Sequence, residues 1–580
     1  REMKSSYKLR ITQWVTGLVA MVILVTVACG GAAAPAAPVA PAATKASSAA
    51  AAPAATAAPQ VMEKAKSARD TATVVTEAEP AAVGAWSEGC SAEIHSIGCQ
   101  DFVSDYITWI DDRNDFEVVL LSGFESYEQM APDRWRFKLR PGVKFHNGEP
   151  WNAEAAKFGI DYNADPTNPS ASITWTGPIK PAEVVDEFTM DVVCGAPCPI
   201  YPRTGIFTDF QAPKWFQAAS EADRSRMTNA FGPYRIIDYQ PGIHTKFEAY
   251  PDYLPNDNFF SQAAVIPFIT HVYRAEATVR AAMVSTGEAD WVADIGFEEA
   301  EKVPKWVSGT TAEVYTLILD TVFHPELKKQ KVRLALAHAI DCQGLLDSLF
   351  QSRIKCWGAI SMEGTVGITP ENSAVREYNP ELSRQLLKEA GYDPVNSIDV
   401  NTRPGSNIRG LEIMEATVTY WRDVGVTSEL NSWGDLAKAR EVQTSGCGRF
   451  YKLDETFKDK LDCDQRDPPG PYFTSSHAYE VATSNEILDQ QRFNNSRMNC
   501  SNRSSRVCRR DLQEQAKAAN AVPAGPERRK AMEAMLDIAY EEVFFIPFMQ
   551  VEYVYGLSED MEWQPYYAPR LRGNTMRFTK

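Results

Sequence analysis

Cysteine is the residue type whose spacing most directly indicates chemistry in this chain of 580 residues. Ten of the eleven cysteines fall as close neighbours: Cys90 and Cys99, Cys194 and Cys198, Cys342 and Cys356, Cys447 and Cys463, and Cys500 and Cys508. In an oxidising compartment such neighbours form disulfides, although spacing alone does not fix the connectivity. The spacing of Cys194-Gly-Ala-Pro-Cys198 differs from the CxxC of redox and zinc sites, and no second ligand pair lies nearby. We therefore expect structural disulfides in an exported protein.

Motifs that would indicate catalysis are absent from the sequence. It contains no HExxH, GxSxG, GxxxxGKS/T or GxGxxG. The seven histidines are scattered, and no two have the spacing of a shared metal site on one helix face. Asp462, Asp464 and Asp467 lack the following glycine and the distal glutamate of a calcium loop. The sequence thus predicts neither a metal nor a cofactor, and it favours a binding protein over an enzyme.

Charge and hydropathy exclude two broad classes of function. The chain has 59 Lys and Arg against 76 Asp and Glu, a formal charge of −17. A nucleic-acid-binding surface needs clustered Lys and Arg, so a nucleic-acid partner is not expected. The mean hydropathy of −0.31 excludes a polytopic membrane protein.

The first 70 residues have the composition of an export signal followed by a tether. Lys4, Lys8 and Arg10 precede an apolar run at 15–28, which is shorter than the ~20 residues of a spanning helix. Thr26-Val-Ala-Cys29-Gly resembles a bacterial lipobox, in which the cysteine becomes lipid-modified; the alternative is an ordinary signal peptide with an incidental cysteine. Residues 30–70 are rich in Ala and Pro and cannot bury enough surface to fold. We therefore expect a lipoprotein signal peptide at 1–29, a tether at 30–70, and a membrane-anchored lipoprotein at the outer face of the cytoplasmic membrane.

Patterns in the rest of the chain predict a mixed α/β protein. The expected strands and helices that the patterns define best are a strand at 71–76, a strand at 134–139, a helix at 152–163 capped by Asn152, a helix from Pro325 to Ile340 with Val332, Leu336 and Ile340 on one stripe, a helix at 380–390 ended by Gly391, a helix at 526–540, and a strand at 543–546. Residues 447–475 have the composition of a long loop.

Several segments in order along the chain resemble the family 5 extracellular solute-binding proteins, the peptide/nickel-type binding components of ABC importers. The strongest is WRFKLRPGVKFHNGEPWNA at 135–153. The others lie at 184–189, 232–242, 280–290, 332–341, 386–392 and 553–557. Together they span roughly residues 70 to 580.

The resemblance implies an α/β, two-lobed periplasmic-binding-protein-like fold with an extra subdomain in the first lobe. Lobe one would comprise 71–275 and 548–580, with the subdomain at about 103–165, and lobe two would comprise 276–547. It also implies closure of the lobes about a hinge, a monomeric receptor, and ABC permease subunits in the membrane as partners.

In the peptide-binding branch of this family an Asp of lobe two holds the ligand amine, in a segment resembling Asp-x-Pro-Asp-Pro. The string Asp464-Gln-Arg-Asp467-Pro-Pro is a degraded version within the expected loop, and residues 476–489 are better placed to enter the cleft. The candidate ligand-binding residues are Asp489 for a ligand cation, with Asn485, His477 and Tyr479 from the same segment, and Trp433 and Trp175 as cleft aromatics. For Asp489 a helix cap or a surface salt bridge is the alternative, and for both tryptophans it is core packing. Trp135 and Phe137 are assigned to the core.

The function expected from these observations is capture of a small polar solute, with a peptide favoured. An oligosaccharide is the alternative ligand, because 13 Trp and 22 Tyr suit a sugar site as well. An exported enzyme on an unfamiliar template, and a surface adhesion or chaperone-like lipoprotein, are the alternative classes.

Overall fold

A computed structural model describes residues 69–79, 82–84, 86, 101–165, 179–403, 409–434, 439, 442, 477–500, 502, 504–568 and 570–579. The expected signal segment with Cys29, nearly all of the tether, Trp175 and the 447–475 loop lie outside the described residues. Within the described part of the chain, no helix has the length and apolar character that a membrane span requires.

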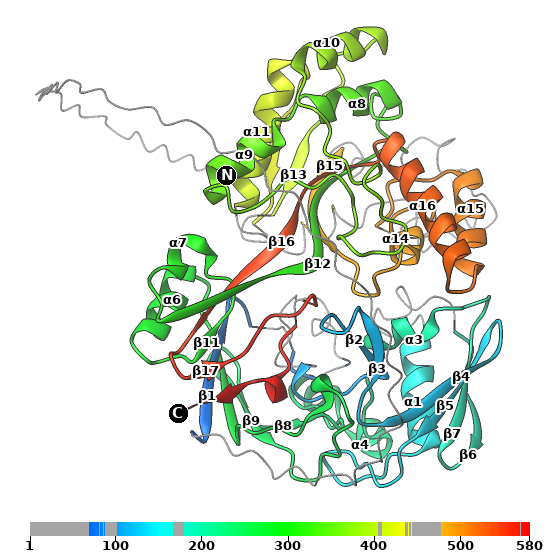
Figure 1. Ribbon diagram of the computed structural model, residues 1–580, viewed down its shortest axis with the longest axis vertical. Helices are drawn as coiled ribbons and strands as arrows, with labels where there is room; N and C mark the ends of the chain where they lie inside the picture. Colours follow the sequence, from blue (N-terminus) through cyan, green and yellow to red (C-terminus); the bar gives the residue numbers. More distant parts are fainter. Residues whose placement is uncertain are drawn as a thin grey trace, which may run out of the picture. The chain divides into compact units, whose positions relative to one another are not determined.

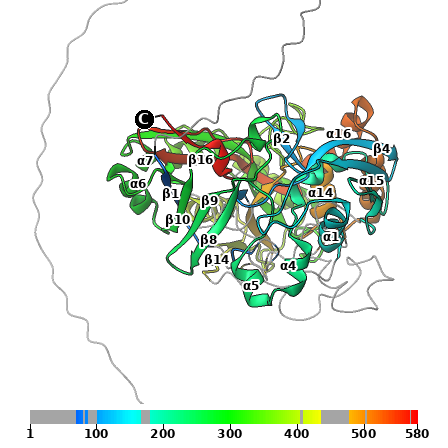
Figure 2. The ribbon, with the colours of Figure 1, turned by 90° about the horizontal axis from the view of Figure 1, so that it is seen from below.

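One mixed sheet of ten strands organises the described residues. From one edge to the other its order is β14 (Leu430–Ser432), β13 (Val400–Thr402), β15 (Ala478–Ser484), β12 (Lys305–Leu319), β16 (Phe545–Leu557), β11 (Trp291–Val292), β1 (Thr71–Thr76), β10 (Phe268–Tyr273), β9 (His244–Ala249) and β8 (Tyr234–Gln240). Figure 2 shows the last four strands, β1 to β8, side by side.

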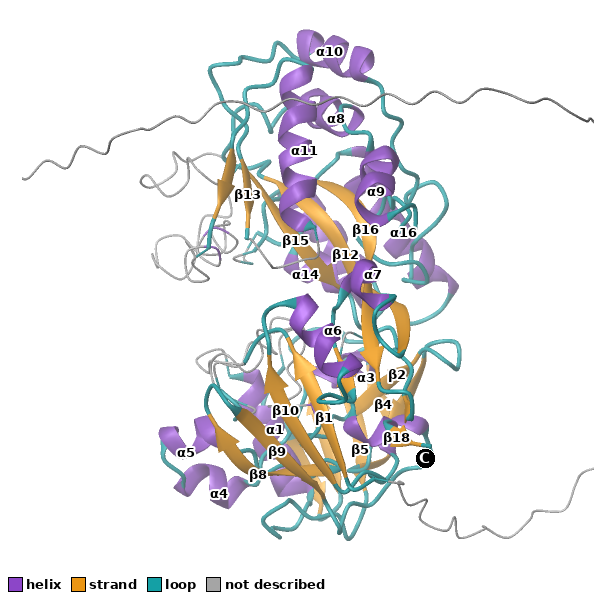
Figure 3. Ribbon diagram, turned by 90° about the vertical axis from the view of Figure 1, so that its left-hand side faces the viewer, coloured by secondary structure: helices purple, strands orange, loops and turns teal. Residues whose placement is uncertain are grey.

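The long strands β12 and β16 join the two ends of this sheet (Figure 3). The first half of β12, 305–310, pairs with 552–557 of β16, beside β11. The second half, 314–318, pairs with 545–550 and carries β15 on its other side. Between these halves, residues 311–313 of β12 face only Val551 of β16, and such an irregularity bends a strand. We call residues 311–313 and Val551 the strand crossover.

We call strands β13–β15 and the helices packed around them lobe two (Figure 1). These helices are α8 (Gln330–His338), α9 (Cys342–Phe350), α10 (Pro380–Glu389), α11 (Gly410–Asp423), α14 (Gln491–Ser496), α15 (Arg510–Ala521) and α16 (Pro526–Glu541). The start and end of α10 show why the local sequence forms it. Asn379 Oδ1 accepts a hydrogen bond from Leu382 N at 2.9 Å, Pro380 occupies the first turn, and Gly391 takes a φ of 58° just beyond the end.

We call strands β1 and β8–β10 lobe one. Strand β11 and helices α6 (Ala277–Ser285) and α7 (Gly296–Ala300) lie within the range 276–547 expected for lobe two, and they pack beside Val75 of β1 and Val554 of β16. The residue at which the chain passes from lobe one to lobe two stays a prediction, as do the other lobe bounds.

Lobe one also carries a second, aromatic core. It forms around the antiparallel sheet of β4 (Phe124–Ala131), β5 (Arg134–Leu139), β7 (Thr189–Val193) and β6 (Glu183–Asp186), with helices α1 (Ala153–Ala164) and α3 (Tyr201–Thr204). Helices α4 (Pro213–Ala218) and α5 (Glu221–Arg226) follow α3 in the chain. The hairpin of β2 (Thr108–Asp111) and β3 (Glu117–Leu120) and the C-terminal pair β17 (Met561–Glu562) and β18 (Arg577–Phe578) pack with the main core. Trp135 and Phe137 are 8% and 0% exposed in the aromatic core, which confirms their assignment.

Three of the expected cysteine pairs form disulfides: Cys194–Cys198, Cys342–Cys356 and Cys500–Cys508. Cys90, Cys99, Cys447 and Cys463 lie outside the described residues.

Local patterns predict some elements well and others poorly. The strand at 71–76 and the cap at Asn152, whose Oδ1 accepts from Ala155 N at 3.0 Å, are confirmed. The helix expected from Pro325 begins only at Gln330, and turns occupy the residues before it. The short strand expected at 543–546 is β16, which continues to Leu557. Pairing with β12 supplies hydrogen bonds far beyond the apolar run that the pattern detects.

Candidate functional site

The loop that follows β15 lies against the strand crossover. Asn485 N donates to Ala312 O at 2.8 Å, and Ala312 N donates to Tyr567 O at 2.6 Å. Ala312 belongs to the crossover, so this one residue holds the loop of lobe two on one side and the C-terminal segment on the other.

Two side chains of lobe one hold the same loop. The Tyr567 hydroxyl donates to Glu486 O at 2.7 Å. Arg203, on α3, donates from Nε to Ile487 O at 2.9 Å and from Nη2 to Phe116 O at 3.3 Å. Residues remote in sequence therefore meet where the two lobes touch.

Charged side chains surround this contact. We call Arg203, Glu486, Arg492, Tyr567 and Arg570 the interlobe cluster. Within it, Arg492 Nε and Glu486 Oε2 lie 3.8 Å apart, and the side chains of both residues are 10% exposed. This separation is longer than a direct hydrogen bond.

Three guanidinium groups gather around α3 and the turn that follows it. Arg203 is part of α3 itself. Arg570 Nη1 donates to Ile206 O at 3.4 Å, and the Arg492 guanidinium lies 5.4 Å from the centre of the Phe207 ring. The cluster is therefore rich in positive charge.

Burial perturbs the titration of the cluster. It lowers the pKa of Arg492 to about 10, with the charge of Glu486 acting in the opposite direction. Burial also lowers the pKa of Arg203. Burial together with Glu486 raises the pKa of Tyr567 well above its ordinary value. Charges in such a poorly hydrated environment interact more strongly than in water. A charged solute bound here would therefore interact strongly with the side chains of the interlobe cluster.

Glu313, in the strand crossover, is a buried acid beside the cluster. Tyr553 donates its hydroxyl to Glu313 Oε2 at 2.9 Å. Burial raises the pKa of Glu313 to about 8; the hydrogen bond from Tyr553 opposes the rise, and Glu486 and Asp294 add to it. The carboxyl group is thus favoured in its neutral form at neutral pH.

Asp489 has its charge neutralised within the protein. Arg528 donates from Nε to Asp489 Oδ2 at 2.7 Å and from Nη2 to Oδ1 at 2.8 Å, and the two side chains are 2% and 1% exposed. Asp489 Oδ1 also accepts from Gln491 N at 2.9 Å, at the start of α14. The pair is a salt bridge, as in one of the alternatives, but it is buried and not at the surface. The N-cap of α14 is Gln490 and not Asp489. A role for Asp489 toward a ligand cation stays a prediction, and the pairing does not favour it.

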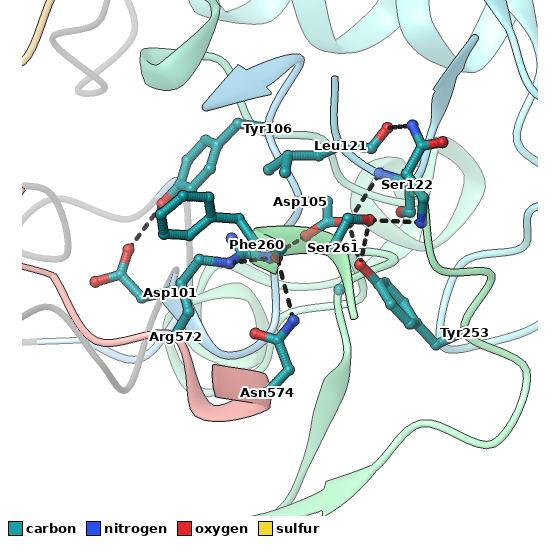
Figure 4. Close-up of polar contacts among 12 residues, drawn as sticks. Asp101, Asp105, Tyr106, Leu121, Ser122, Tyr253, Phe260, Ser261, Arg572 and Asn574 are labelled. Carbon is teal, nitrogen blue, oxygen red and sulfur yellow. Dashed lines mark hydrogen bonds and ion pairs between the residues drawn. The ribbon is translucent and has the colours of Figure 1, made fainter. Parts of the chain in front are cut away.

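A similar buried pair fixes the C-terminal segment to lobe one (Figure 4). Arg572 Nη2 lies 2.5 Å from Asp105 Oδ1, with both side chains fully buried, and Tyr253 donates its hydroxyl to Asp105 Oδ2 at 2.9 Å. Arg572 Nε and Asn574 Nδ2 both donate to Phe260 O. This pair holds in place the segment that presents Tyr567 and Arg570.

The other candidates from the 476–489 segment lie at opposite ends of β15. Asn485 is fully buried beside the crossover, where its Nδ2 donates to Ser361 Oγ at 3.2 Å. His477 precedes the strand and accepts from Asp399 N at 3.0 Å through Nδ1. The Tyr479 hydroxyl donates to Ser504 O at 3.0 Å. A strand of this length spans roughly 20 Å, so β15 places His477 and Tyr479 far from Asn485.

Trp433 directly follows β14 and is half-buried. Its Nε1 donates to Asn401 Oδ1 at 3.0 Å, and its ring packs on a core of lobe two. Trp175 lies outside the described residues. Ligand contact by either tryptophan stays a prediction.

The sequence reasoning did not find Arg203, Arg492, Tyr567 or Arg570. Glu486 could have been found, because it directly follows Asn485. The others carried no motif, since they come from segments that only the fold brings together. Searched over the described ranges, the chain has no group of three or more His, Cys, Asp or Glu placed to hold a metal ion.

A sheet that continues between two lobes, with a polar site at the crossover, defines a two-lobed α/β binding protein. A model of bacterial extracellular solute-binding proteins, family 5, matches residues 124–450 through its middle region. The chain therefore belongs to this family, whose members are solute-binding receptors and not enzymes.

Curated relatives are similar over part of their length. The chain is 25% identical over 330 residues to the glutathione-binding protein GsiB of Pectobacterium atrosepticum, and 24% identical over 330 residues to GsiB of Escherichia coli K12. Each alignment covers 53% of this chain and 60% of the relative.

Solved structures match nearly all of the described fold. The oligopeptide-binding protein AppA of Bacillus subtilis, in complex with a nonapeptide, has a TM-score of 0.71 at 16% identity, covering 89% of this chain and 100% of AppA. AgaA of A. tumefaciens R10, in complex with agropinic acid, has a TM-score of 0.69 at 16% identity, covering 88% and 99%. NikA of Staphylococcus aureus, in complex with Ni(L-His)2, has a TM-score of 0.66 at 14% identity, covering 88% and 100%. These likenesses show the two-lobed α/β fold that the sequence predicts.

Proposed function

We propose that this chain is the extracytoplasmic substrate-binding component of an ABC importer. It captures a small polar solute between its lobes and delivers the solute to a membrane permease. One observation carries the proposal: buried polar and charged side chains of both lobes meet at the loop after β15, directly on the strands that connect the lobes. Membership of the solute-binding family supports it.

A peptide or peptide-like compound is the solute that suits the cluster best. Such a solute carries an amine and a carboxylate, and burying both requires partners of opposite charge. Glu486 offers an acid, and Arg203, Arg492 and Arg570 offer cations. An oligosaccharide site would instead present aromatic faces with neutral polar groups. GsiB is named as a glutathione-binding protein and AppA as an oligopeptide-binding protein, and both names support a peptide-like solute.

The experiment is a ligand screen on the purified protein. We expect one class of solute to raise the melting temperature in a thermal-shift screen of peptides, glutathione, oligosaccharides and metal chelates. A solute at 100 times its Kd adds about 2.7 kcal/mol to the free energy of unfolding by mass action. Consumption of the responding solute would contradict a binding role and indicate an enzyme.

We also propose that Cys29 anchors the protein to the outer face of the cytoplasmic membrane through a lipid, with residues 30–70 as the tether. The lipobox-like sequence before Cys29 and the Ala/Pro composition after it support this. Cys29→Ser should move the protein from the membrane fraction to the soluble fraction. Retention of that variant on membranes after an alkaline wash would contradict the anchor.

A further inference from the structure

A cavity in lobe two shares no lining residue with the interlobe cluster among the described residues. Its walls include Ala337 of α8, Leu536 and Tyr540 of α16, Phe548 of β16, and the segment 356–360. The cavity has a volume of about 50 Å³. A water molecule needs roughly 10–15 Å³ of such space, so the cavity has room for about four atoms the size of a methylene group.

The walls of this cavity are held in place by covalent and hydrogen bonds. The disulfide Cys342–Cys356 joins the start of α9 to the segment 356–360. That segment lies along β16, where Cys356 forms an antiparallel bridge with Met549 and Trp357 N donates to Phe548 O at 2.9 Å. The cavity is therefore formed before a ligand enters it, and a preformed site costs little ordering entropy on binding.

Arg376 is the one charged side chain among the described residues that line the cavity. Its Nη2 donates to Tyr540 O, and its guanidinium lies 4.1 Å from the centre of the Tyr540 ring. Within the described ranges, no carboxylate oxygen lies within 4.0 Å of this guanidinium. Burial lowers the pKa of Arg376, with Tyr540 acting in the opposite direction. A guanidinium has five donors, so most of those of Arg376 are available to a ligand.

The residues beside Arg376 make the edge of the cavity apolar. Val375, which lines the cavity, and Tyr378 are each 45% exposed although both are large and apolar. No acidic side chain lines the cavity in the part of the chain that the structure describes, so no carboxylate is there to neutralise an ammonium group. The cavity thus suits a small anion with an apolar tail, and it does not suit a zwitterionic amino acid or peptide.

We propose that this cavity binds a short-chain carboxylic acid, with the carboxylate on Arg376 and the apolar tail between α8 and α16. A planar guanidinium presents paired N–H donors that match both oxygens of a carboxylate. The proposal concerns a second site and does not depend on the solute that the lobes capture. The competing explanation is a gap in packing beside an arginine that only satisfies a carbonyl at the end of α16, as cations do at helix C-termini.

The first test compares small ligands on the wild-type protein by NMR titration with saturation transfer. From propanoate to pentanoate the affinity should rise about fourfold per methylene, and it should rise less beyond pentanoate, because the cavity is then full. Pentanamide, which lacks the charge, should bind about tenfold more weakly than pentanoate or worse. Norvaline, which is pentanoate with an added ammonium group, should also bind more weakly.

The second test locates the bound acid. A pentanoate that carries a photoreactive diazirine on its tail should label the 356–360 segment or α16 of the wild-type protein, as read by peptide mass spectrometry. In Arg376→Gln the affinity for pentanoate should fall about tenfold or more, while the affinity for pentanamide should stay unchanged. The matched control is Arg384→Gln, because Arg384 also donates to a backbone carbonyl, that of Asp423, but lies exposed on α10.

Three outcomes would overturn the proposal. The first is affinities for pentanoate and pentanamide within about threefold of each other, which would show that no cation selects the acid. The second is photolabelling only at residues that do not line the cavity. The third is an equal loss of both ligands in Arg376→Gln, which would show that Arg376 only supports the end of α16. If Arg376→Gln does not fold, the ligand series and the photolabelling of the wild-type protein decide.

Discussion

Asp489 shows how burial and a paired charge change what a single carboxylate does in the protein. From the sequence it is a candidate partner for a ligand cation, yet both of its oxygens contact Arg528 in an environment that excludes water. Removing one partner of such a pair leaves an uncompensated buried charge, whereas removing one partner of an exposed pair changes little.

We therefore expect Asp489→Asn to lower the free energy of unfolding by about 3–5 kcal/mol in urea denaturation. The control is Glu527→Gln, which breaks an exposed pair with Lys530 whose side chains are 79% and 72% exposed, and it should cost less than about 0.5 kcal/mol. An Asp489→Asn protein of unchanged stability that loses solute affinity would instead restore the ligand-binding role.

Glu313 makes the stability of the strand crossover depend on pH. Its pKa is about 8 in the folded protein against an ordinary value of 4.5, so the folded state holds a proton that the unfolded state releases. This contribution to stability is complete below pH 4.5 and is lost as the pH rises toward 8, by up to about 1.4 kcal/mol per pH unit.

Glu313→Gln keeps the group neutral at every pH. We expect its free energy of unfolding to fall less steeply than that of the wild type between pH 4.5 and 8, with the exposed Glu363→Gln as the control. Chemical denaturation across this pH range measures the difference. Parallel curves for Glu313→Gln and the wild type would show that Glu313 ionises normally.

Among the elements, α1 depends on a local feature that can be tested in isolation. Asn152 adopts an extended backbone, and its side chain accepts the hydrogen bond from Ala155 N. Asn152→Ala should lower the free energy of unfolding by about 1 kcal/mol, and Asn152→Gly by only a few tenths, because glycine lets water reach the freed donor. Equal losses for both variants would show that Asn152 acts through packing and not as a cap.

At the scale of the whole molecule, the oxidation state of the cysteines indicates the compartment in which the protein folds. Three disulfides are formed among the described residues, and apart from Cys29 the sequence has only four other cysteines. We expect no free thiols in the mature protein when it is labelled under denaturing, non-reducing conditions. Four or more reactive thiols would contradict export into an oxidising compartment.

Local sequence was sufficient for the features that depend on a few neighbouring residues. The cap at Asn152, the C-terminal glycine at Gly391 and the neighbouring cysteine pairs follow from contacts within short segments. The family motifs likewise predict the two-lobed fold. Each of these features is encoded in a window of a few residues to about twenty.

The site required the tertiary structure. Arg203, Glu486 and Arg570 lie in three distant segments, and nothing near any one of them in sequence indicates the other two. The same holds for Asp489, whose buried ion-pair partner Arg528 lies on α16, far along the chain. The extent of β16 depended on β12, whose hydrogen bonds extend it past the apolar run. Sequence patterns report which residues prefer burial, but the free energy of a buried charge depends on its partners in space, and the fold alone supplies those partners.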